Sequence, residues 1–155
     1  MGGRFLQLRV PPPLVGLVLA AGMWAISHVS LVLHWPLAAR LSVAISIAVL
    51  GVAIALRGVW SFHRAKTTVN PLKPEKTAAL VSTGVYSFMR NPMYLGMALV
   101  LVAWAVYLSA VGTVIGPLLF IWYITQFQII PEERVLDGLF GESFAEYKKR
   151  VRRWL

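Results

Sequence analysis

The chain is 155 residues long, and 58% of its residues are hydrophobic while only 14% are charged. Soluble domains average roughly 45–50% apolar and about 25% charged residues, so this composition excludes an ordinary water-soluble globule. The 15 Lys and Arg residues against 6 Asp and Glu give a net charge of +9, which in so apolar a chain predicts contact with lipid head groups and no nucleic-acid binding. The chain has no cysteine and its three histidines lack the spacing of a zinc helix, so we expect no metal.

Four apolar segments are long enough to cross a bilayer, whose hydrocarbon core of about 30 Å takes roughly 20 helical residues. We therefore predict an all-α protein, an integral membrane bundle of four transmembrane helices forming a single domain over residues 1–155. The third and fourth segments are uncharged and are joined by a tight turn near Gly112, which predicts a helical hairpin, with a kink at Pro117. In chain order, the predicted spans cover residues 14–33, 41–60, 93–111 and 113–130.

The charged residues predict the orientation of this bundle, because Lys and Arg collect in cytoplasmic loops. With four spans, the connections on one side contain only one basic residue, Arg40. The other basic residues lie at or toward the opposite side, and all six acidic residues lie there too, in the polar segments 61–91 and 131–155. We expect both termini in the cytoplasm of a bacterium, at its inner membrane, with the endoplasmic reticulum as the alternative membrane.

The third predicted span begins with the sequence Arg90-Asn91-Pro92. Asparagine is a good N-cap and proline fits the first helical position. The free backbone N–H groups and the positive end of the helix dipole would then face the membrane interface beside Arg90, which suits a carboxylate or a phosphate. An ordinary capped helix with an arginine anchor explains the same residues, so both interpretations stay open.

Two adjacent glutamates follow the fourth predicted span. On a helix that begins at Glu132, this residue shares a face with apolar side chains at i+4, i+7 and i+8, whereas Glu133 turns about 100° away. A carboxylate beside an apolar face at the membrane boundary is costly unless it meets a cation or hydroxyl groups. Glu132 is therefore a candidate ligand group, and an acid that is stabilised only by the helix dipole is the alternative.

The sequence after Gly141 predicts a second helix, over residues 142–155. Its apolar side carries Phe144 and Tyr147, and its other side is rich in basic residues. This pattern predicts an amphipathic helix that lies on the cytoplasmic leaflet and binds anionic head groups. A direct catalytic part for Tyr147 or Arg153 is the alternative.

Three separated blocks of this sequence resemble one family of membrane enzymes. The blocks are residues 80–96, the Glu132-Glu133 pair, and Phe140-Gly141 together with Phe144, Tyr147 and residues 148–151. In this order, over roughly residues 67–155, they look like the superfamily of isoprenylcysteine carboxyl methyltransferases and phospholipid methyltransferases. The first two spans match that superfamily only as apolar helices.

The resemblance implies an enzyme that transfers a methyl group from S-adenosylmethionine to a lipophilic acceptor at the cytoplasmic face of a membrane. The cofactor would bind between segments 67–96 and 131–155. Carried over by position, the catalytic and orienting groups would be Arg90, Asn91, Tyr94 and Glu132. The resemblance implies cofactor contacts from these four and from seven further residues, namely Leu80, Val81, Tyr86, Pro92, Met93, Glu133 and Tyr147. Which of the two glutamates contacts the cofactor is left open.

Two departures from the family pattern narrow what the resemblance implies. Asn91 occupies a position where many members have histidine, so no imidazole proton is available there. The stretch 126–130 lacks the arginine with which the carboxyl methyltransferases hold a prenylcysteine carboxylate, so prenylcysteine is not assigned as the acceptor. The alternatives to methyl transfer are an NADPH-dependent membrane reductase of related fold and a non-catalytic small membrane protein.

Overall fold

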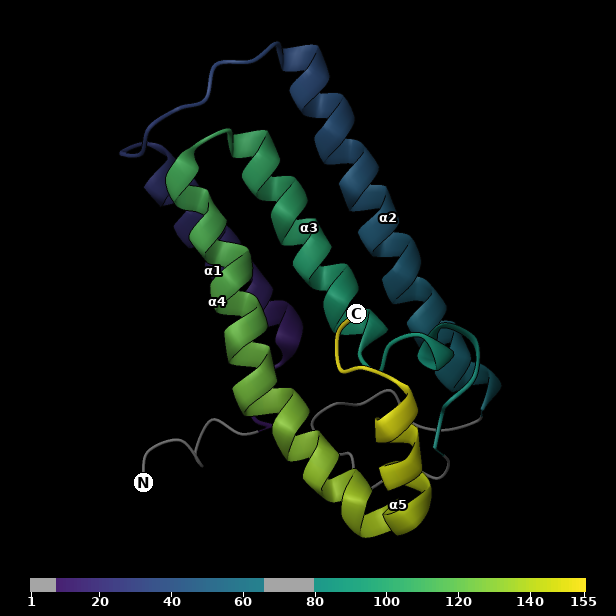
Figure 1. The fold of residues 1–155 in the computed structure, drawn as a ribbon. Coiled ribbons are helices and arrows are strands. Elements are labelled where there is room, and N and C mark those ends of the chain that lie inside the picture. The colour runs from purple at the N-terminus through teal and green to yellow at the C-terminus, as the bar shows by residue number, and fades with distance from the viewer. Residues whose placement is uncertain (1–7, 66–79) are drawn as a thin grey trace, which may run out of the picture.

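A computed structural model describes residues 8–65 and 80–155. The elements of this described part are all helices, which confirms the predicted all-α class. The long ones lie side by side, and the last of them turns back on itself (Figure 1). The helices are α1 (Pro12–Ser27), α2 (Leu37–Arg64), α3 (Pro92–Leu108), α4 (Ile115–Ile124) and α5 (Ile130–Arg150), with short 3-10 helices η3 (Gly84–Ser87) and η4 (Val111–Val114) and a π-helical turn η5 (Thr125–Ile129).

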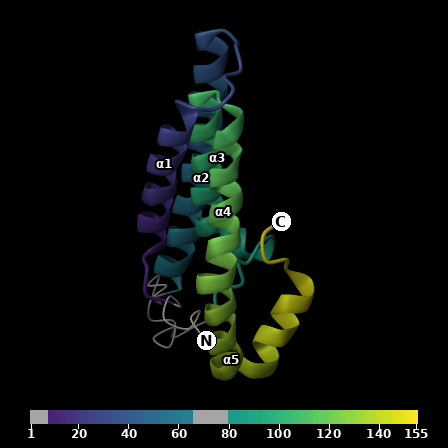
Figure 2. The same ribbon diagram turned by 90° about the vertical axis from the view of Figure 1, so that its left-hand side faces the viewer.

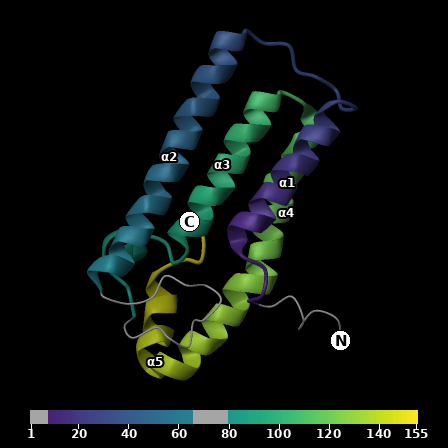
Figure 3. The ribbon, with the colours of Figure 1, turned by 180° about the vertical axis from the view of Figure 1, so that it is seen from behind.

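Helix α3 is the centre of the bundle. It packs against α2 on one side and against α1 and α4 on the other, as Figure 3 shows from behind. Where α1, α3 and α4 meet, a continuous apolar core contains Met23, Phe120, Ile124 and Ile129, each less than 2% exposed. Because α3 is apolar on all sides, it is suited to a position between other helices.

Helices α2 and α3 approach closely because glycines face each other at their contact. A Cβ built on Gly51 would lie 2.7 Å from the carbonyl oxygen of Gly96, and a Cβ on Gly96 would overlap the carbonyl oxygen of Gly51 and lie 2.7 Å from Ala55 Cβ. Small residues at such a contact let helix backbones approach and gain van der Waals packing, the main source of helix association in lipid.

We expect Gly96→Ala to lower the melting temperature of the purified protein, because the added methyl group would meet backbone atoms that cannot move aside. Overpacking of this kind costs about 1–3 kcal/mol. The matched control is Gly138→Ala on α5, since a Cβ at that position meets nothing within 4 Å and the change improves helix propensity by about 0.8–1 kcal/mol. Thermal melts in detergent check both; equal melting temperatures for the two variants would contradict the proposed α2–α3 contact.

The first predicted span is longer than the helix that forms. Helix α1 ends at Ser27 rather than at Leu33, because the chain after it is extended and pairs with the turn that follows α3. The Leu33 backbone N–H donates to the Ser109 carbonyl (2.7 Å), and the Val111 N–H donates to the Leu31 carbonyl (2.9 Å). Apolar composition alone could not distinguish this extended segment from a continuing helix.

The helical stretch formed by α4, η5 and α5 is irregular at a different place from the predicted kink at Pro117. Pro117 falls in the first turn of α4, where its missing N–H leaves no helical hydrogen bond unmade. The reason for predicting a kink at this proline therefore does not apply. The helix instead widens into the π-helical turn at Thr125–Ile129, directly before the two glutamates.

Helix α5 bends sharply at Gly141, whose backbone has φ 49° and ψ −119°. Beyond it the chain reverses and rises beside the first half of α5 (Figure 2). The Lys148 ammonium spans the bend and donates to both carboxylate oxygens of Asp137, at 2.5 and 2.7 Å. Glycine permits this turn because a side chain at positive φ would be strained.

The second half of α5 is shorter than the predicted helix over residues 142–155. It ends at Arg150, and Val151 already has extended backbone angles. The tail, residues 151–155, leaves the helix because its backbone bonds to the segment before α3: the Arg90 N–H donates to the Arg152 carbonyl at 3.0 Å. The prediction of a helix to the last residue was therefore wrong.

The described part contains two helices that are long and apolar enough to cross a membrane. They are Leu37–Arg64 and the continuous stretch Val111–Arg150. Helices α1 and α3 are also apolar but have only 16 and 17 residues. The four-span bundle and its orientation stay predictions, and residues 67–79 of the predicted cofactor-binding segment 67–96 lie outside the described residues.

Candidate functional site

Three segments that are far apart in the sequence meet at one end of α3. They are the residues that lead into α3, the start of α5, and the C-terminal tail. The Asn91 side-chain amide donates to the Arg153 carbonyl at 2.9 Å, and Met89 forms a parallel bridge with Arg152. The tail is thereby tied to the entrance of α3, and the first turn of α5 lies beside both.

The first polar contact of this region joins Tyr94 and Glu132. The Tyr94 hydroxyl donates to Glu132 Oε1 at 2.6 Å. Tyr94 is only 6% exposed and Glu132 is half-buried. One carboxylate from α5 and one phenol from α3 therefore share a protected position, as the predicted cofactor site requires.

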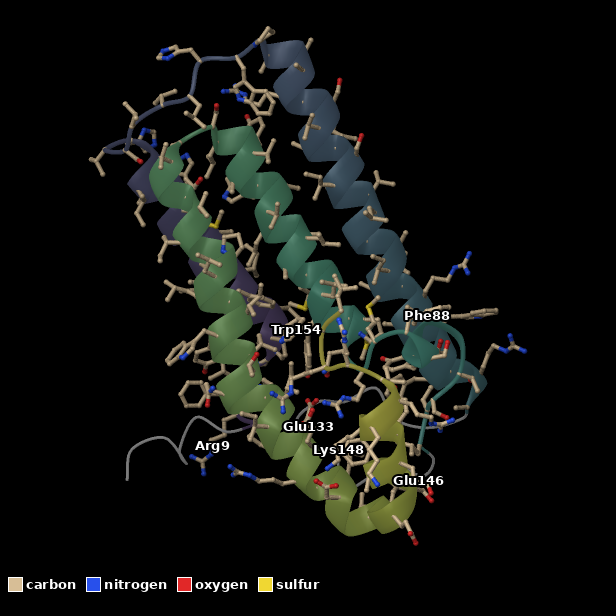
Figure 4. The ribbon with its side chains drawn as sticks, viewed as in Figure 1. Arg9, Phe88, Glu133, Glu146, Lys148 and Trp154 are labelled. Carbon is tan, nitrogen blue, oxygen red and sulfur yellow. The ribbon has the colours of Figure 1, made fainter. Side chains whose placement is uncertain are left out.

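The second polar contact is an ion-pair network around Glu133. Arg90 Nη2 donates to Glu133 Oε1 at 2.9 Å, and Arg153 Nη2 donates to Glu133 Oε2 at 2.7 Å. Glu133 lies on α5 near the tail, which ends with Trp154 and Leu155 (Figure 4). The glutamate side chain is 15% exposed, and its two carboxylate oxygens each accept from one guanidinium, so both are paired by charge-assisted hydrogen bonds.

Arg90 has a donor left over. Among the residues that the structure describes, its Nε is buried and has no hydrogen-bond partner. A buried donor without an acceptor is costly, so this nitrogen can gain from an anionic group of a ligand. We call the set of five residues Arg90, Tyr94, Glu132, Glu133 and Arg153 the glutamate site.

Two further tyrosines predicted to contact a cofactor lie next to the glutamate site. The Tyr147 hydroxyl donates to the Tyr86 carbonyl at 2.6 Å, and the Tyr86 ring meets Phe62 edge-on at 5.3 Å. Burial raises the pKa of Tyr147 to about 12, and burial together with Tyr147 and Glu132 raises the pKa of Tyr86 further above its usual value. Both phenols are therefore neutral at physiological pH and present polarisable rings and O–H donors.

The other residues predicted to line the site have different surroundings. Leu80 packs against the cluster of Phe144, Tyr147 and Val151. The next residue, Val81, is also buried. Pro92 and Met93 lie against Gly58 of α2. A Cβ added to Gly58 would lie 2.8 Å from Met93 Cγ. This contact uses Pro92 and Met93 in helix packing, and their part in cofactor binding stays a prediction.

Asn91 has a different role from the expected one. It occupies the N-cap position of α3, yet its side chain makes no capping hydrogen bond. Its amide instead holds the tail, as described above. The tail explains this difference, because the Arg153 carbonyl offers an acceptor that local sequence could not reveal.

Two tail residues belong to this region: Arg153, for which the sequence predicts a catalytic part only as the alternative, and Trp154, which it does not assign to the site. The position of Arg153 on the basic side of the predicted helix favours contact with lipid head groups, whereas in the structure its guanidinium pairs with Glu133. The Trp154 indole N–H donates to Thr125 Oγ1 of the π-helical turn at 3.3 Å. The helical pattern of the sequence continues through Trp154, so no local signal marked the change to an extended tail.

The environment of Glu132 favours its neutral form. Burial raises the pKa of this carboxyl to about 8, the Tyr94 hydrogen bond opposes the rise, and the neighbouring charge of Glu133 adds to it. Glu132 lies just beyond the apolar stretch that ends at Ile130. A cation placed beside it would favour the ionised form and so would be bound there.

We expect the effect of Glu132→Gln on thermal stability to depend on pH. The folded protein holds the Glu132 proton more tightly than the unfolded chain, so the stabilisation is complete below about pH 4.5 and is lost as the pH rises through about 8. The melting temperature of the variant should therefore match that of the parent at pH 5 and exceed it at pH 9. A difference that stays constant between these pH values would contradict a raised pKa.

The glutamate site can hold a zwitterionic or cationic organic molecule. Glu132 can accept from an ammonium or hydroxyl group, Arg90 can donate to a carboxylate, and the tyrosine rings can face a positive charge. Within residues 8–65 and 80–155, no group of three His, Asp or Glu side chains is placed to hold a metal ion. The carboxyl group of Glu132 and the free donor of Arg90 fit an organic cofactor with separate positive and negative groups.

A family model described as "Phospholipid methyltransferase" matches residues 39–143 of the chain. This range includes most of α2, all of α3 and α4 and the first half of α5, and so four of the five residues of the glutamate site. No solved structure matches the chain.

Three curated relatives show what the chain is similar to. It is 44% identical over 63 residues to an uncharacterized protein of Haemophilus influenzae, covering 41% of this chain and all of that protein. It is 32% identical over 83 residues to a protein-S-isoprenylcysteine O-methyltransferase of Schizosaccharomyces pombe, a match that covers 51% of this chain and 34% of that enzyme. It is 27% identical over 118 residues to protein-S-isoprenylcysteine O-methyltransferase B of Arabidopsis thaliana, a match that covers 76% of this chain and 58% of that enzyme. The matches thus span between a third and three fifths of the two enzymes.

Proposed function

The chain belongs to the phospholipid methyltransferase family, and we propose that it transfers a methyl group from S-adenosylmethionine to a lipophilic acceptor, with the glutamate site as the place where the cofactor binds. The single observation that carries this proposal is the 2.6 Å hydrogen bond between Tyr94 and Glu132. It brings together the two sequence blocks, one before and one after the hairpin, that the family resemblance assigns to one pocket.

Each group of the site has a chemical role in this proposal. Glu132 holds the amino group or a ribose hydroxyl of the cofactor, and Arg90 holds its carboxylate through the nitrogen that has no protein partner. Glu133 and Arg153 keep Arg90 in place. The rings of Tyr94, Tyr86 and Tyr147 stabilise positive charge by about 0.5–2 kcal/mol each where they face it.

S-adenosylmethionine supplies an activated methyl group on a sulfonium ion, and no covalent intermediate with the protein is needed. The protein must hold the acceptor atom, the methyl carbon and the sulfur in line and exclude bulk water. A half-buried carboxylate and a buried phenol at the end of an apolar bundle meet both demands, since they orient the cofactor while α3 and α4 keep the surroundings dry.

The acceptor in this proposal is lipophilic, because the glutamate site lies directly at the end of the apolar stretch that runs to Ile130. A prenylcysteine carboxylate is disfavoured by the stretch before the glutamates. Gln128 is fully buried there and donates through Nε2 to the Val10 carbonyl at 2.8 Å. A neutral, already bonded amide offers no cation to a carboxylate acceptor.

The proposed setting is a bacterial inner membrane crossed four times, with the glutamate site and both termini on the cytoplasmic side. Two observations support it. The start of α1 and the bend of α5 lie toward the same end of the bundle (Figure 1), and the glutamate site joins the start of α3 to the start of α5 at that end. Arg40, the one basic residue of the predicted outer connections, lies in the first turn of α2 at the opposite end.

A thermal-shift experiment on the detergent-purified chain separates this proposal from its alternatives. A ligand that binds only the folded state raises the melting temperature by mass action. We expect S-adenosylhomocysteine to stabilise the protein and NADPH to leave it unchanged. Stabilisation by NADPH alone would identify a reductase, and no response to either compound would indicate a non-catalytic protein.

A further inference from the structure

An apolar groove of about 670 Å³ runs along the bundle, away from the glutamate site. Helices α1 and α2 each pack against α3 but barely touch each other, so α3 forms the floor between them. The groove has a volume within the roughly 300–1,000 Å³ typical of small-molecule sites. Its lining is almost entirely apolar and includes Gly16, Ala20, Ala48, Val52, Val100 and Trp104.

A cation lies where this groove reaches the end of the bundle opposite the glutamate site. The groove is lined there by Leu41 and Tyr107, and the Arg40 guanidinium carbon lies 5.7 Å from the centre of the Tyr107 ring. Among the residues that the structure describes, Arg40 Nε is buried and has no hydrogen-bond partner. This donor therefore needs an acceptor that the described protein does not supply.

The helix end that carries Arg40 also favours an anion. Helix α2 begins at Leu37 after Pro36, with no side-chain cap and no acidic residue in its first turn. A basic side chain at a helix N-terminus opposes the helix dipole. No Asp or Glu side chain among residues 8–65 and 80–155 offsets this charge, because all of those described lie on α5 at the other end.

We propose that this groove binds an anionic phospholipid, with its phosphate at Arg40 and the start of α2 and an acyl chain along α3 between α1 and α2. Charge complementarity selects this occupant. A second copy of the chain would bring apolar helix surface to the groove but no anion to Arg40, because the described acidic residues are confined to α5. The lipid would also fill the space that keeps α1 and α2 apart.

This lipid site is separate from the proposed methyl-transfer site. Its far end is lined by Pro13, Leu56 and Met97, and neither Tyr94 nor Glu132 belongs to its lining. The proposal rests on the proposed membrane location but not on methyl transfer. Its test therefore includes S-adenosylhomocysteine as an independent readout of the glutamate site.

The test is a thermal-shift titration of the full chain in detergent with phosphatidylglycerol, with phosphatidylcholine and with inorganic phosphate. We expect phosphatidylglycerol to stabilise the parent protein more than phosphatidylcholine, and phosphate alone to have no effect. Arg40→Gln should weaken phosphatidylglycerol binding by about tenfold or more, as loss of a charge-assisted hydrogen bond does. The matched control is Arg57→Gln, an exposed arginine on the same helix, which should keep the full response.

A second variant tests the groove itself. Ala48→Phe places a ring in the groove and should reduce stabilisation by phosphatidylglycerol, while S-adenosylhomocysteine should stabilise Ala48→Phe and Arg40→Gln as it does the parent. Three results would each overturn the proposal: equal stabilisation by both lipids, an equal shift with inorganic phosphate, or an unchanged lipid response in Arg40→Gln. A change from dimer to monomer in Ala48→Phe, measured by light scattering, with no change in lipid response would assign the groove to a second copy.

Discussion

Glu132→Gln should weaken S-adenosylmethionine binding by about tenfold to a hundredfold and lower the methyl-transfer rate at limiting cofactor accordingly. The expected size follows from the loss of one charge-assisted hydrogen bond, about 1.5–3 kcal/mol. Glutamine has the same shape, and its carbonyl can still accept from the Tyr94 hydroxyl, so the fold should be kept. Calorimetry on the detergent-purified protein measures the affinity.

A truncated ligand sharpens this experiment. 5′-Methylthioadenosine has the adenosine part of the cofactor but neither its ammonium nor its carboxylate. If Glu132 holds the ammonium, Glu132→Gln weakens S-adenosylhomocysteine binding and leaves 5′-methylthioadenosine binding unchanged; if it holds the ribose, both are weakened. The control is Glu142→Gln, an exposed glutamate on the same helix, which should bind both as the parent does. Unchanged affinity of Glu132→Gln for both ligands would exclude Glu132 from the site.

Arg90→Gln should have an effect of similar or larger size, because it removes two contributions at once. The substitution takes away the donor proposed for the cofactor carboxylate, and it leaves Glu133 with Arg153 as its remaining partner in the described ion-pair network. We expect a loss of S-adenosylhomocysteine affinity of about a hundredfold, which corresponds to about 2.8 kcal/mol and lies near the upper end of the range for a hydrogen bond to a charged group. Calorimetry again provides the measurement.

The control for Arg90→Gln is Arg134→Gln. Arg134 follows the two glutamates directly but is exposed, so its loss removes the same charge from the same neighbourhood without touching the site. Binding of 5′-methylthioadenosine to Arg90→Gln should be nearly unchanged, because that ligand has no carboxylate. An equal loss for both ligands would show that Arg90 supports the local structure and does not hold the carboxylate.

Periodicity and composition predicted much of this molecule because they report local physics. The start of α3 at Pro92, the hairpin turn near Gly112 and the break at Gly141 follow from proline, glycine and apolar runs. The inward position of Glu132 followed from its place on an apolar helix face. These features depend on neighbours in the chain, so the sequence contains their causes.

The features that the sequence did not reveal depend on partners far along the chain. Helix α1 ends early because the Leu33 N–H donates to the Ser109 carbonyl. Asn91 does not cap α3 because its side-chain amide donates to the Arg153 carbonyl. The tail becomes extended for the same reason. Each case exchanges a local hydrogen bond for a distant one, and a periodic pattern cannot show which acceptor the fold will bring near.

The most direct test of cofactor binding between the start of α3 and the start of α5 is ultraviolet cross-linking of S-adenosylmethionine that carries a labelled methyl group. Mass spectrometry then maps the labelled peptides of the purified full chain. We expect label in peptides from residues 80–96 and 130–154, competed away by S-adenosylhomocysteine. Competed label confined to α1 and α2, or no competed label at all, would contradict the proposed site.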